Sequence, residues 1–262
     1  MTVDVQRKSL IEFFADSVRK VGDAHLLAIE ATKTKLAGKI GKDSGLFYVP
    51  RVLNFDKKKG VLDLERLNGL VTLLQLAIDN DAQLLEFSEK AGRALQVIHK
   101  QLILPDEMKH ELPPEWMDWP DKNVFIHGDF ACINVCLHQP TGQLVILDWS
   151  AAPAIGRTPT FGSRYFDILW FVSCAFRGAP GTKILRWNAE GIADAFLKGY
   201  LNHSSSQNLN RFKDYLPNIC RLHRKKVRYL AGQRSVIKAA AYICPQVLMY
   251  ARLRKFLHNY EF

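Results

Sequence analysis

The chain has 262 residues, of which 48% are hydrophobic and 24% are charged, and its formal net charge is +10. This is an ordinary globular composition with room for one large or two small domains. No uncharged apolar run reaches the roughly eighteen residues of a membrane-spanning helix, and the N-terminus does not resemble a signal peptide. We therefore expect a cytoplasmic protein.

The five cysteines are scattered, and no two of them have C-x-x-C spacing. Cys132 and Cys136 lack the second pair of ligands that a zinc site needs. The sequence therefore predicts reduced thiols in an interior rather than disulfides or a metal cluster.

The first part of the chain is predicted to be a small, strand-rich unit. The apolar spacing in 9–20 suits an amphipathic helix, and the aliphatic segment 25–32 suits a strand. The lysine- and glycine-containing segment 38–45 is predicted to be a flexible loop. Two further strands are expected at 47–55 and 61–66, on either side of a polar turn.

From Asn68-Gly69 onward the pattern becomes mainly helical. We therefore expect one domain over 1–68 and a second, larger one over 69–262. Apolar residues in 81–101 recur every three or four positions, as on the buried face of a helix. Beyond it we expect strands at 123–126, 135–138 and 144–148, and then helices over 164–257 with breaks near 178–181 and 203–207.

The segment HGDFACIN (127–134), followed by ILDW (146–149), is the most informative part of the sequence. Each polar loop comes directly after an apolar strand, so rigid strand ends can bring Asp129, Asn134 and Asp148 together. Phosphoryl transfer uses such a set: one carboxylate accepts a hydroxyl proton, and an Asn and a second Asp hold Mg²⁺ against the phosphates.

H-G-D-x-x-x-x-N followed by I-L-D-W resembles the motifs of the aminoglycoside phosphotransferase/choline kinase-like family, small-molecule relatives of the protein kinases. Gly128 stands where the protein-kinase pattern has Arg. The resemblance extends over about residues 47–170. It includes VPRVL (49–53), LDLERLNG (62–69), ALQVIH (94–99) and YFDIL (165–169).

This resemblance implies an α+β, two-lobed protein-kinase-like fold, with a reduced strand-rich N-lobe and a larger, mainly helical C-lobe. It also implies transfer of phosphate from ATP, with Mg²⁺, to a hydroxyl group. By position, Asp129 would be the catalytic base, and Asn134 and Asp148 would be the Mg²⁺ ligands. His127 would brace the catalytic loop, and Asp167 would be a structural residue at a helix start.

The resemblance also implies that the hinge backbone around Glu65 and Leu67 would receive the adenine ring.

The rest of the N-lobe departs from the family pattern. The predicted strand 25–32, however, has Glu30 where a V-A-I-K-like strand has its phosphate-contacting lysine. Lys33 or Lys35 would have to serve instead, and neither a glycine-rich hairpin nor a helix glutamate is apparent.

Two interpretations follow from this departure. In the first, the reduced N-lobe still binds Mg·ATP, mainly through the metal ligands, and the protein is an enzyme. In the second, the protein is a catalytically weak or inactive kinase-fold module that docks on an anionic partner. The complete set of Asp129, Asn134 and Asp148 favours the enzyme.

The last fifth of the chain carries the whole excess of positive charge. Residues 211–262 contain twelve Lys or Arg but only Asp214 and Glu261 as acids. This charge disfavours a cationic acceptor and favours a small-molecule, sugar or glycolipid-type hydroxyl acceptor that is anionic or lies at an anionic surface. Peripheral contact of 237–256 with an anionic membrane is one interpretation, and packing on the lobe is the other. The basic run lacks the aromatic platforms of a specific nucleic-acid binder.

Overall fold

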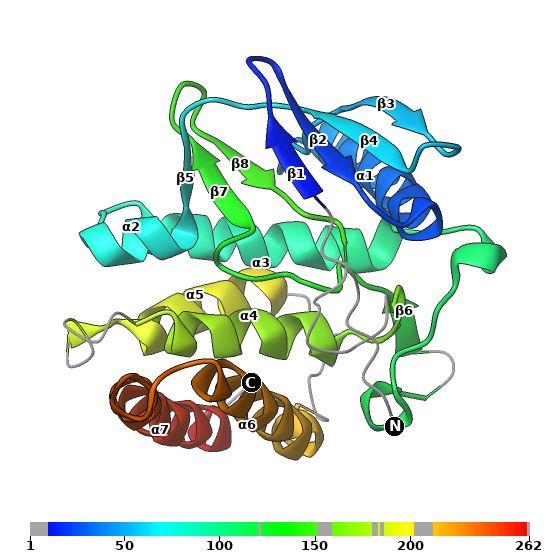
Figure 1. Ribbon diagram of the computed structural model, residues 1–262. Helices are drawn as coiled ribbons and strands as arrows, with labels where there is room; N and C mark the ends of the chain where they lie inside the picture. Colours follow the sequence, from blue (N-terminus) through cyan, green and yellow to red (C-terminus); the bar gives the residue numbers. More distant parts are fainter. Residues whose placement is uncertain are drawn as a thin grey trace.

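The computed structural model describes residues 10–119, 122–150, 159–179, 183, 186–201 and 212–260. Its N-terminal lobe is an antiparallel sheet in the order β1-β2-β4-β3, with helix α1 packed on one face (Figure 1). Leu27 and Ala31 of α1 are buried against Leu62 of the sheet. The elements are β1 (Leu10–Phe13), β2 (Ser17–Val21), α1 (Ala24–Ser44), β3 (Val52–Asp56) and β4 (Val61–Glu65).

The chain leaves this sheet at Glu65 and enters a second one at Leu70. The second sheet has the order β5-β7-β8, and β6 pairs separately with β9. Backbone bonds join the sheet to the N-terminal lobe, since Tyr48 N donates to Leu144 O at 2.8 Å and Ile146 N donates to Tyr48 O at 3.0 Å. The strands are β5 (Leu70–Thr72), β6 (Asn123–Phe125), β7 (Val135–His138), β8 (Gln143–Ile146) and β9 (Phe161–Ser163).

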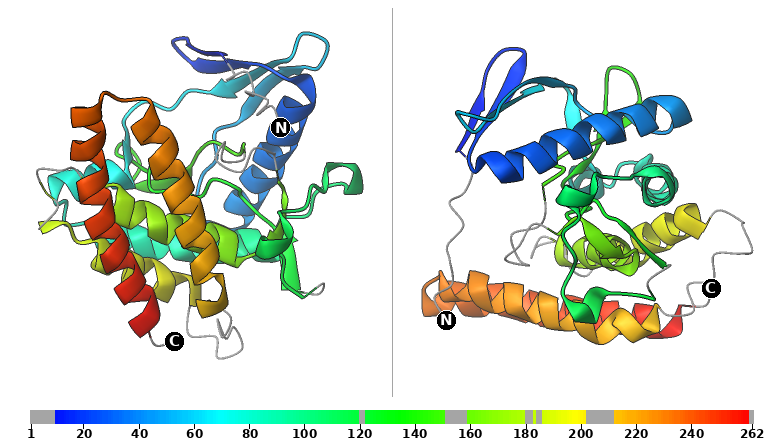
Figure 2. Two further views of the ribbon diagram at one scale, coloured as in Figure 1. Left: turned by 60° about the horizontal axis from the view of Figure 1, so that its bottom comes forward. Right: turned by 90° about the vertical axis from the view of Figure 1, so that its right-hand side faces the viewer.

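Helices make up most of the second lobe and lie below the sheets in Figure 1. Helices α3, α4 and α5 enclose an aromatic core in which the rings of Phe171 and Phe196 stack at 4.0 Å. Helices α6 and α7 run side by side on the far side of α4 (Figure 2). The helices are α2 (Leu73–Asp79), α3 (Leu84–Gln101), α4 (Tyr165–Arg177), α5 (Ala189–Leu201), α6 (Leu216–Gly232) and α7 (Val236–Asn259), with short 3₁₀ turns at Asp106–Met108, Pro114–Trp116 and Lys213–Tyr215.

The predicted two-lobed α+β architecture is confirmed, as are the strands near 61–66, 123–126, 135–138 and 144–148 and the helix near 81–101. The predicted strand at 47–55 is shorter, since β3 begins at Val52. The expected helix break near 178–181 is present, because α4 ends at Arg177. The break expected near 203–207 lies outside the described residues.

The amphipathic helix predicted at 9–20 is wrong, because this segment forms the β1–β2 hairpin. Short apolar runs do not distinguish a helix from a strand, and here pairing with β4 decides the outcome. Val18 lies opposite Leu64, and Lys20 lies opposite Leu62. The described part of the N-lobe therefore contains a two-stranded hairpin, although its turn (Phe14, Ala15, Asp16) has no glycine.

The strand predicted at 25–32 and the loop predicted at 38–45 are also wrong, because both belong to α1. Asp23 caps the helix: its side chain accepts hydrogen bonds from His25 N and Leu26 N at 2.9 and 3.0 Å. Gly41 lies inside the helix. A Cβ at this position would be 2.4 Å from the carbonyl oxygen of Phe47, so the close approach of the chain requires glycine. Gly45 ends the helix at φ +66°, so only the last of these glycines has the role of a chain breaker.

Two glycines let α3 and α5 approach backbone to backbone. A Cβ at Gly92 would lie 2.0 Å from the carbonyl oxygen of Phe196, and one at Gly199 would lie 2.0 Å from that of Glu89. We expect Gly92→Ala to lower the free energy of unfolding by at least about 2 kcal/mol, because the helices must separate. Urea denaturation measures this change.

Gly38→Ala is the matched control, because it is also inside a helix but meets only Val49 Cβ at 3.9 Å. It should raise the free energy of unfolding by about 0.5 kcal/mol through helix propensity. Equal effects of the two substitutions would contradict the close approach of α3 and α5.

Candidate active site

The loop that follows β6 is held by one buried carboxylate, that of Asp167 on α4. Asp167 accepts hydrogen bonds from the backbone N–H groups of His127 at 2.7 Å and Gly128 at 2.9 Å. The φ of Gly128 is +89°, a conformation that favours glycine, so no arginine occupies this place without strain. The side chain of Asp167 on α4 therefore fixes the backbone of this loop.

Asp167 is itself part of a buried network. The ring of His99 on α3 joins Asp167 Oδ2 at 3.1 Å and the hydroxyl of Tyr200 on α5 at 2.9 Å. Burial alone would raise the pKa of Asp167, but the bonds from His99 and from the loop backbone outweigh it and lower that pKa. Asp167 and His99 are thus structural, and they attach the loop to three helices.

His127 joins the two polar loops. Its Nδ1 accepts from Asp129 N at 3.2 Å, and its Nε2 donates to the carbonyl of Leu147 at 3.2 Å. Burial, followed by the nearby Lys33 ammonium, lowers the pKa of His127 to about 4, so the ring is neutral near pH 7. The side chain lies fully buried against Trp149, consistent with a bracing role.

Asp129 and Asn134 lie side by side in this loop. Asn134 Nδ2 donates to Asp129 Oδ2 at 3.1 Å and to the carbonyl of Asp129 at 2.9 Å. The indole of Trp170 on α4 donates to Asp129 Oδ1 at 2.6 Å. Trp170 was not predicted from the sequence, because it lies 41 positions from Asp129 and belongs to no spaced motif.

Asp148 lies after β8 with φ +55°, in a left-handed conformation that Asp tolerates better than most residues. Its Oδ1 accepts from Ser150 Oγ at 2.7 Å and from Lys20 Nζ at 2.7 Å. Burial opposes ionisation, but the Lys20 ammonium outweighs it and lowers the pKa of Asp148. Backbone strain of this kind is concentrated at functional sites.

The structure reveals a buried lysine–glutamate pair that the sequence analysis missed. Lys20 Nζ on β2 lies 2.5 Å from Glu30 Oε1 on α1, while also contacting Asp148. Burial disfavours the Lys20 ammonium, but the two carboxylates more than compensate and raise its pKa. Burial also raises the pKa of Glu30. The feature of the sequence that would have indicated this pair is the helix N-cap Asp23. Its cap makes 24–44 a helix, which places Glu30 on α1 and leaves Lys20 on the preceding strand β2.

The two lysines predicted to contact phosphate differ in their surroundings. Lys33 is fully buried on α1, and its Nζ donates to the carbonyl of His127 at 2.6 Å. Burial lowers the pKa of Lys33 to about 8, although the surrounding carboxylates, Asp167 first, partly offset this effect. Lys35 is exposed and lines a cavity of about 800 Å³ along the outer side of α1, together with Arg51.

The hinge residues lie between the two sheets. Glu65 ends β4, and its Oε2 accepts from the hydroxyl of Tyr48 at 2.6 Å and from Arg51 N at 3.1 Å. Leu67 is half-buried in the connection to β5. The Glu65 side chain is thus occupied by hydrogen bonds, which leaves the backbone as the part of this segment that could meet a ligand.

A divalent cation would find two suitable ligands here. No three His, Cys, Asp or Glu side chains gather as a metal site in the part of the chain that the structure describes. Mg²⁺, however, is commonly held by one or two protein oxygens together with substrate phosphates. Asp148 supplies a carboxylate and Asn134 an amide whose described bonds use only Nδ2. This donor set fits Mg²⁺ brought with a nucleotide.

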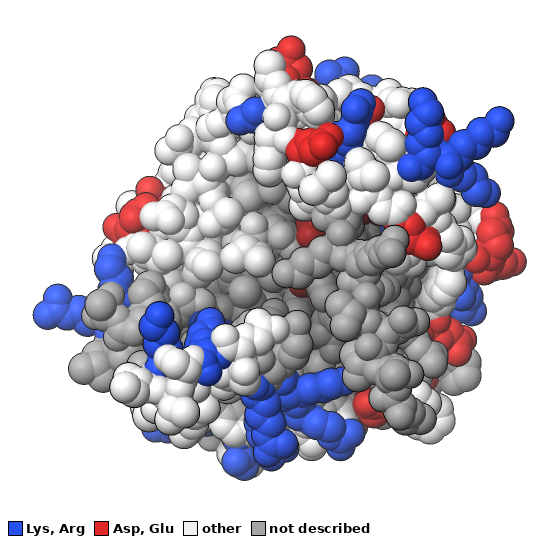
Figure 3. Space-filling view, in the orientation of Figure 1, with Lys and Arg blue, Asp and Glu red and all other residues white. Residues whose placement is uncertain are grey.

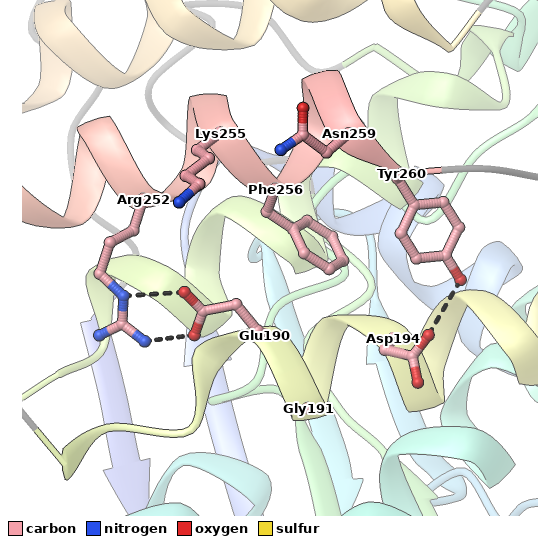
Figure 4. A pocket seen from close by; sticks show the side chains of 8 residues that line it. All are labelled: Glu190, Gly191, Asp194, Arg252, Lys255, Phe256, Asn259 and Tyr260. Atoms are coloured by element: carbon pink, nitrogen blue, oxygen red, sulfur yellow. Dashed lines mark hydrogen bonds and ion pairs between the residues drawn. The ribbon is translucent and has the colours of Figure 1, made fainter.

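A second cavity, of about 730 Å³, lies between α5 and α7, away from these loops (Figure 4). Arg252 of α7 binds both carboxylate oxygens of Glu190, and the hydroxyl of Tyr260 donates to Asp194 at 3.3 Å. These contacts attach α7 to α5. The residues of the kinase-type motifs lie elsewhere, on the loops that follow β6 and β8.

No protein-family profile matches the sequence, and no curated protein matches it. Solved structures do match. Glucosamine kinase bound to glucosamine, ADP and inorganic phosphate is 11% identical with a TM-score of 0.56, covering 98% of this chain and 85% of that one. Amicoumacin kinase hAmiN is 12% identical with a TM-score of 0.53, covering 94% and 88%. Choline kinase LicA from Streptococcus pneumoniae is 14% identical with a TM-score of 0.50, covering 98% and 91%. The chain therefore has the protein-kinase-like fold that these small-molecule kinases share.

The buried Lys33 makes stability depend on pH. Its pKa is about 8 in the folded protein and near 10.5 in an unfolded chain, so the folded state releases the proton first as pH rises. The stability of the wild type relative to Lys33→Met should therefore increase between these pH values, by up to about 1.4 kcal/mol per pH unit. Urea denaturation at a series of pH values measures this difference.

Lys35→Met, on the exposed side of the same helix, is the control and should change stability equally at every pH. A Lys33→Met difference that does not vary with pH would contradict the buried position of the amine.

Proposed function

We propose that the protein is a Mg·ATP-dependent phosphotransferase that acts on a hydroxyl group of a small-molecule, sugar or glycolipid-type acceptor. The observation that carries this proposal is Lys20, held between Glu30 and Asp148 at 2.5 and 2.7 Å. It supplies a buried, charged lysine with a helix glutamate as partner, which is the part that the kinase pattern requires and the sequence seemed to lack.

Asp129 is the proposed catalytic base. Its carboxylate would accept the proton of the acceptor hydroxyl as the oxygen–phosphorus bond forms and the bond to the ADP oxygen breaks. Hydrogen bonds from Trp170 and Asn134 hold one carboxylate oxygen each and so fix the plane of the group. His127 acts only through the backbone, by keeping Asp129 and the Asp148 loop in register.

The remaining residues would bind the nucleotide. Asn134 and Asp148 would hold Mg²⁺, which when bound neutralises the phosphates and draws charge toward the leaving group. Lys20 would turn its ammonium from Asp148 to a phosphate oxygen while keeping Glu30 as its partner. The backbone between Glu65 and Leu67 would receive the adenine ring. The proposal thus assigns to Lys20 the contact expected of Lys33 or Lys35.

The acceptor class rests on two weaker arguments. The structural neighbours include a glucosamine kinase, so the fold accommodates a sugar acceptor, although the likeness is one of fold. The basic residues of 211–262 favour an acceptor that is anionic or is presented at an anionic surface. ATP as donor places the proposed reaction in the cytoplasm. Among the described residues, no helix combines the length and the apolar character needed to cross a membrane.

Calorimetry of ATP binding with and without Mg²⁺ is the first test. We expect saturable, Mg²⁺-dependent binding that Asp148→Asn weakens by at least about tenfold, because a metal ligand and a partner of Lys20 is lost. Asp129→Asn should bind Mg·ATP as the wild type does and lower turnover by about 10²- to 10⁴-fold.

Absence of binding at millimolar nucleotide would contradict the proposal and favour the alternative, a kinase-fold binding module without activity. Equal Mg·ATP affinity in Asp148→Asn and the wild type would contradict the metal assignment alone.

Trp170→Phe tests how Asp129 is oriented. Loss of the indole N–H should lower kcat by about tenfold and leave the KM for ATP unchanged, because the bond steers the base rather than the nucleotide. Trp187→Phe is the control, since it removes a buried 2.7 Å indole bond to the carbonyl of Ala175. Similar kcat values in the two variants would rule out the orienting role.

A further inference from the structure

Helix α7 carries an exposed apolar surface on its first four turns. Val236 and Ile237 are 86% and 84% exposed, and Val247 is 61% exposed. The only charged residue between Val236 and Ala251 is Lys238. Exposed apolar patches of this kind mark contact sites for proteins or membranes. We call the following six exposed residues of α7 the apolar surface: Val236, Ile237, Ala240, Ile243, Val247 and Leu248.

The two halves of α7 differ in how they meet the lobe. Met249, Leu253 and Leu257 are buried, and Arg252 pairs with Glu190 (Figure 4), so the second half is attached. Among the side chains described from 236 to 245, none is buried. The first half therefore projects beyond the lobe with α6 beside it (Figure 2), which leaves its apolar side chains unused by the fold.

The neighbouring helix provides a basic stripe. Arg221, Arg224, Lys225 and Arg228 of α6 are exposed, and their spacing of three and four residues places them on one face. Arg234, in the turn between the helices, is exposed as well. In the described part of 211–262, Asp214 is the sole acid, so basic residues outnumber acidic ones beside the apolar surface. Figure 3 shows basic side chains gathered along the lower edge of the molecule, where these helices lie.

We propose that the α6–α7 hairpin docks the protein on an anionic lipid surface, with the apolar surface of α7 inserted at the headgroup level and the basic stripe of α6 on the headgroups. A lipid surface offers both of the required features, negative charge and an apolar layer beneath it. A second copy would bring like charges together, and a nucleic acid would leave the apolar side chains in water. Docking of this kind would bring the enzyme to acceptors carried by lipids.

Co-sedimentation with vesicles tests the proposal on the full chain. We expect retention on phosphatidylcholine vesicles that contain phosphatidylglycerol, little retention on phosphatidylcholine alone, and release at high salt. The double variant V236S/I237S should lower the retained fraction by about tenfold at every salt concentration at which the wild type is retained, because it removes apolar insertion. Its circular dichroism and Tm should match the wild type, since neither side chain is buried. Ile103→Ser, at a 72% exposed position after α3, is the matched control.

The charge contribution is tested by R224Q/K225Q, which should weaken retention at low salt only. Its control is K57Q/K58Q, in the exposed turn between β3 and β4. No retention on anionic vesicles at low salt, or an equal loss in Ile103→Ser, would overturn the proposal. A dimer that dissociates in V236S/I237S would also overturn it, by assigning the apolar surface to a second copy. None of these outcomes depends on nucleotide binding or turnover.

Discussion

The arrangement of the site depends on the buried carboxylate of Asp167. A charge without solvent is stable only when hydrogen bonds replace the lost water, and Asp167 has donors from His99 and from two consecutive backbone amides. Those amides belong to His127 and Gly128, just before Asp129, so the donors that stabilise the buried charge also fix the backbone that leads to the proposed base. The hydrogen bonds of Asp167 therefore both connect the helices of the second lobe and fix the geometry of the loop.

A second layer of polar contacts connects the lobes. Lys20 reaches Asp148 from β2, and Lys33 reaches the carbonyl of His127 from α1. Both lysines are largely removed from water, and their pKa values move in opposite directions because Lys20 has two carboxylates in direct contact and Lys33 has a neutral carbonyl. Local surroundings, rather than residue type, decide which amine remains a reliable positive charge for an anionic ligand.

The sequence predicted the helical lobe and the placement of Asp129 and Asp148 in loops after short strands, because turn-forming and polar residues bound these strands on both sides. The roles of the loop residues stay predictions. The prediction failed in the first 45 residues for a physical reason. The strand β2 is only five residues long and is defined by its pairing with β4, which no local pattern reveals. Misplacing that strand hid Lys20, and treating α1 as a strand and a loop hid Glu30. Trp170 shows the same limit, since only the packing of α4 brings its indole to Asp129.

Helix α1 has a consequence for how parts of the molecule can move. Swinging this helix outward would separate Glu30 from Lys20 and withdraw the Lys33 amine from its carbonyl at the same time. Both contacts are buried, so an outward position of α1 would lose two hydrogen bonds of charged groups at once. The position of α1 therefore links the β1–β2 hairpin to the loop that follows β6, and neither can be displaced independently of this helix.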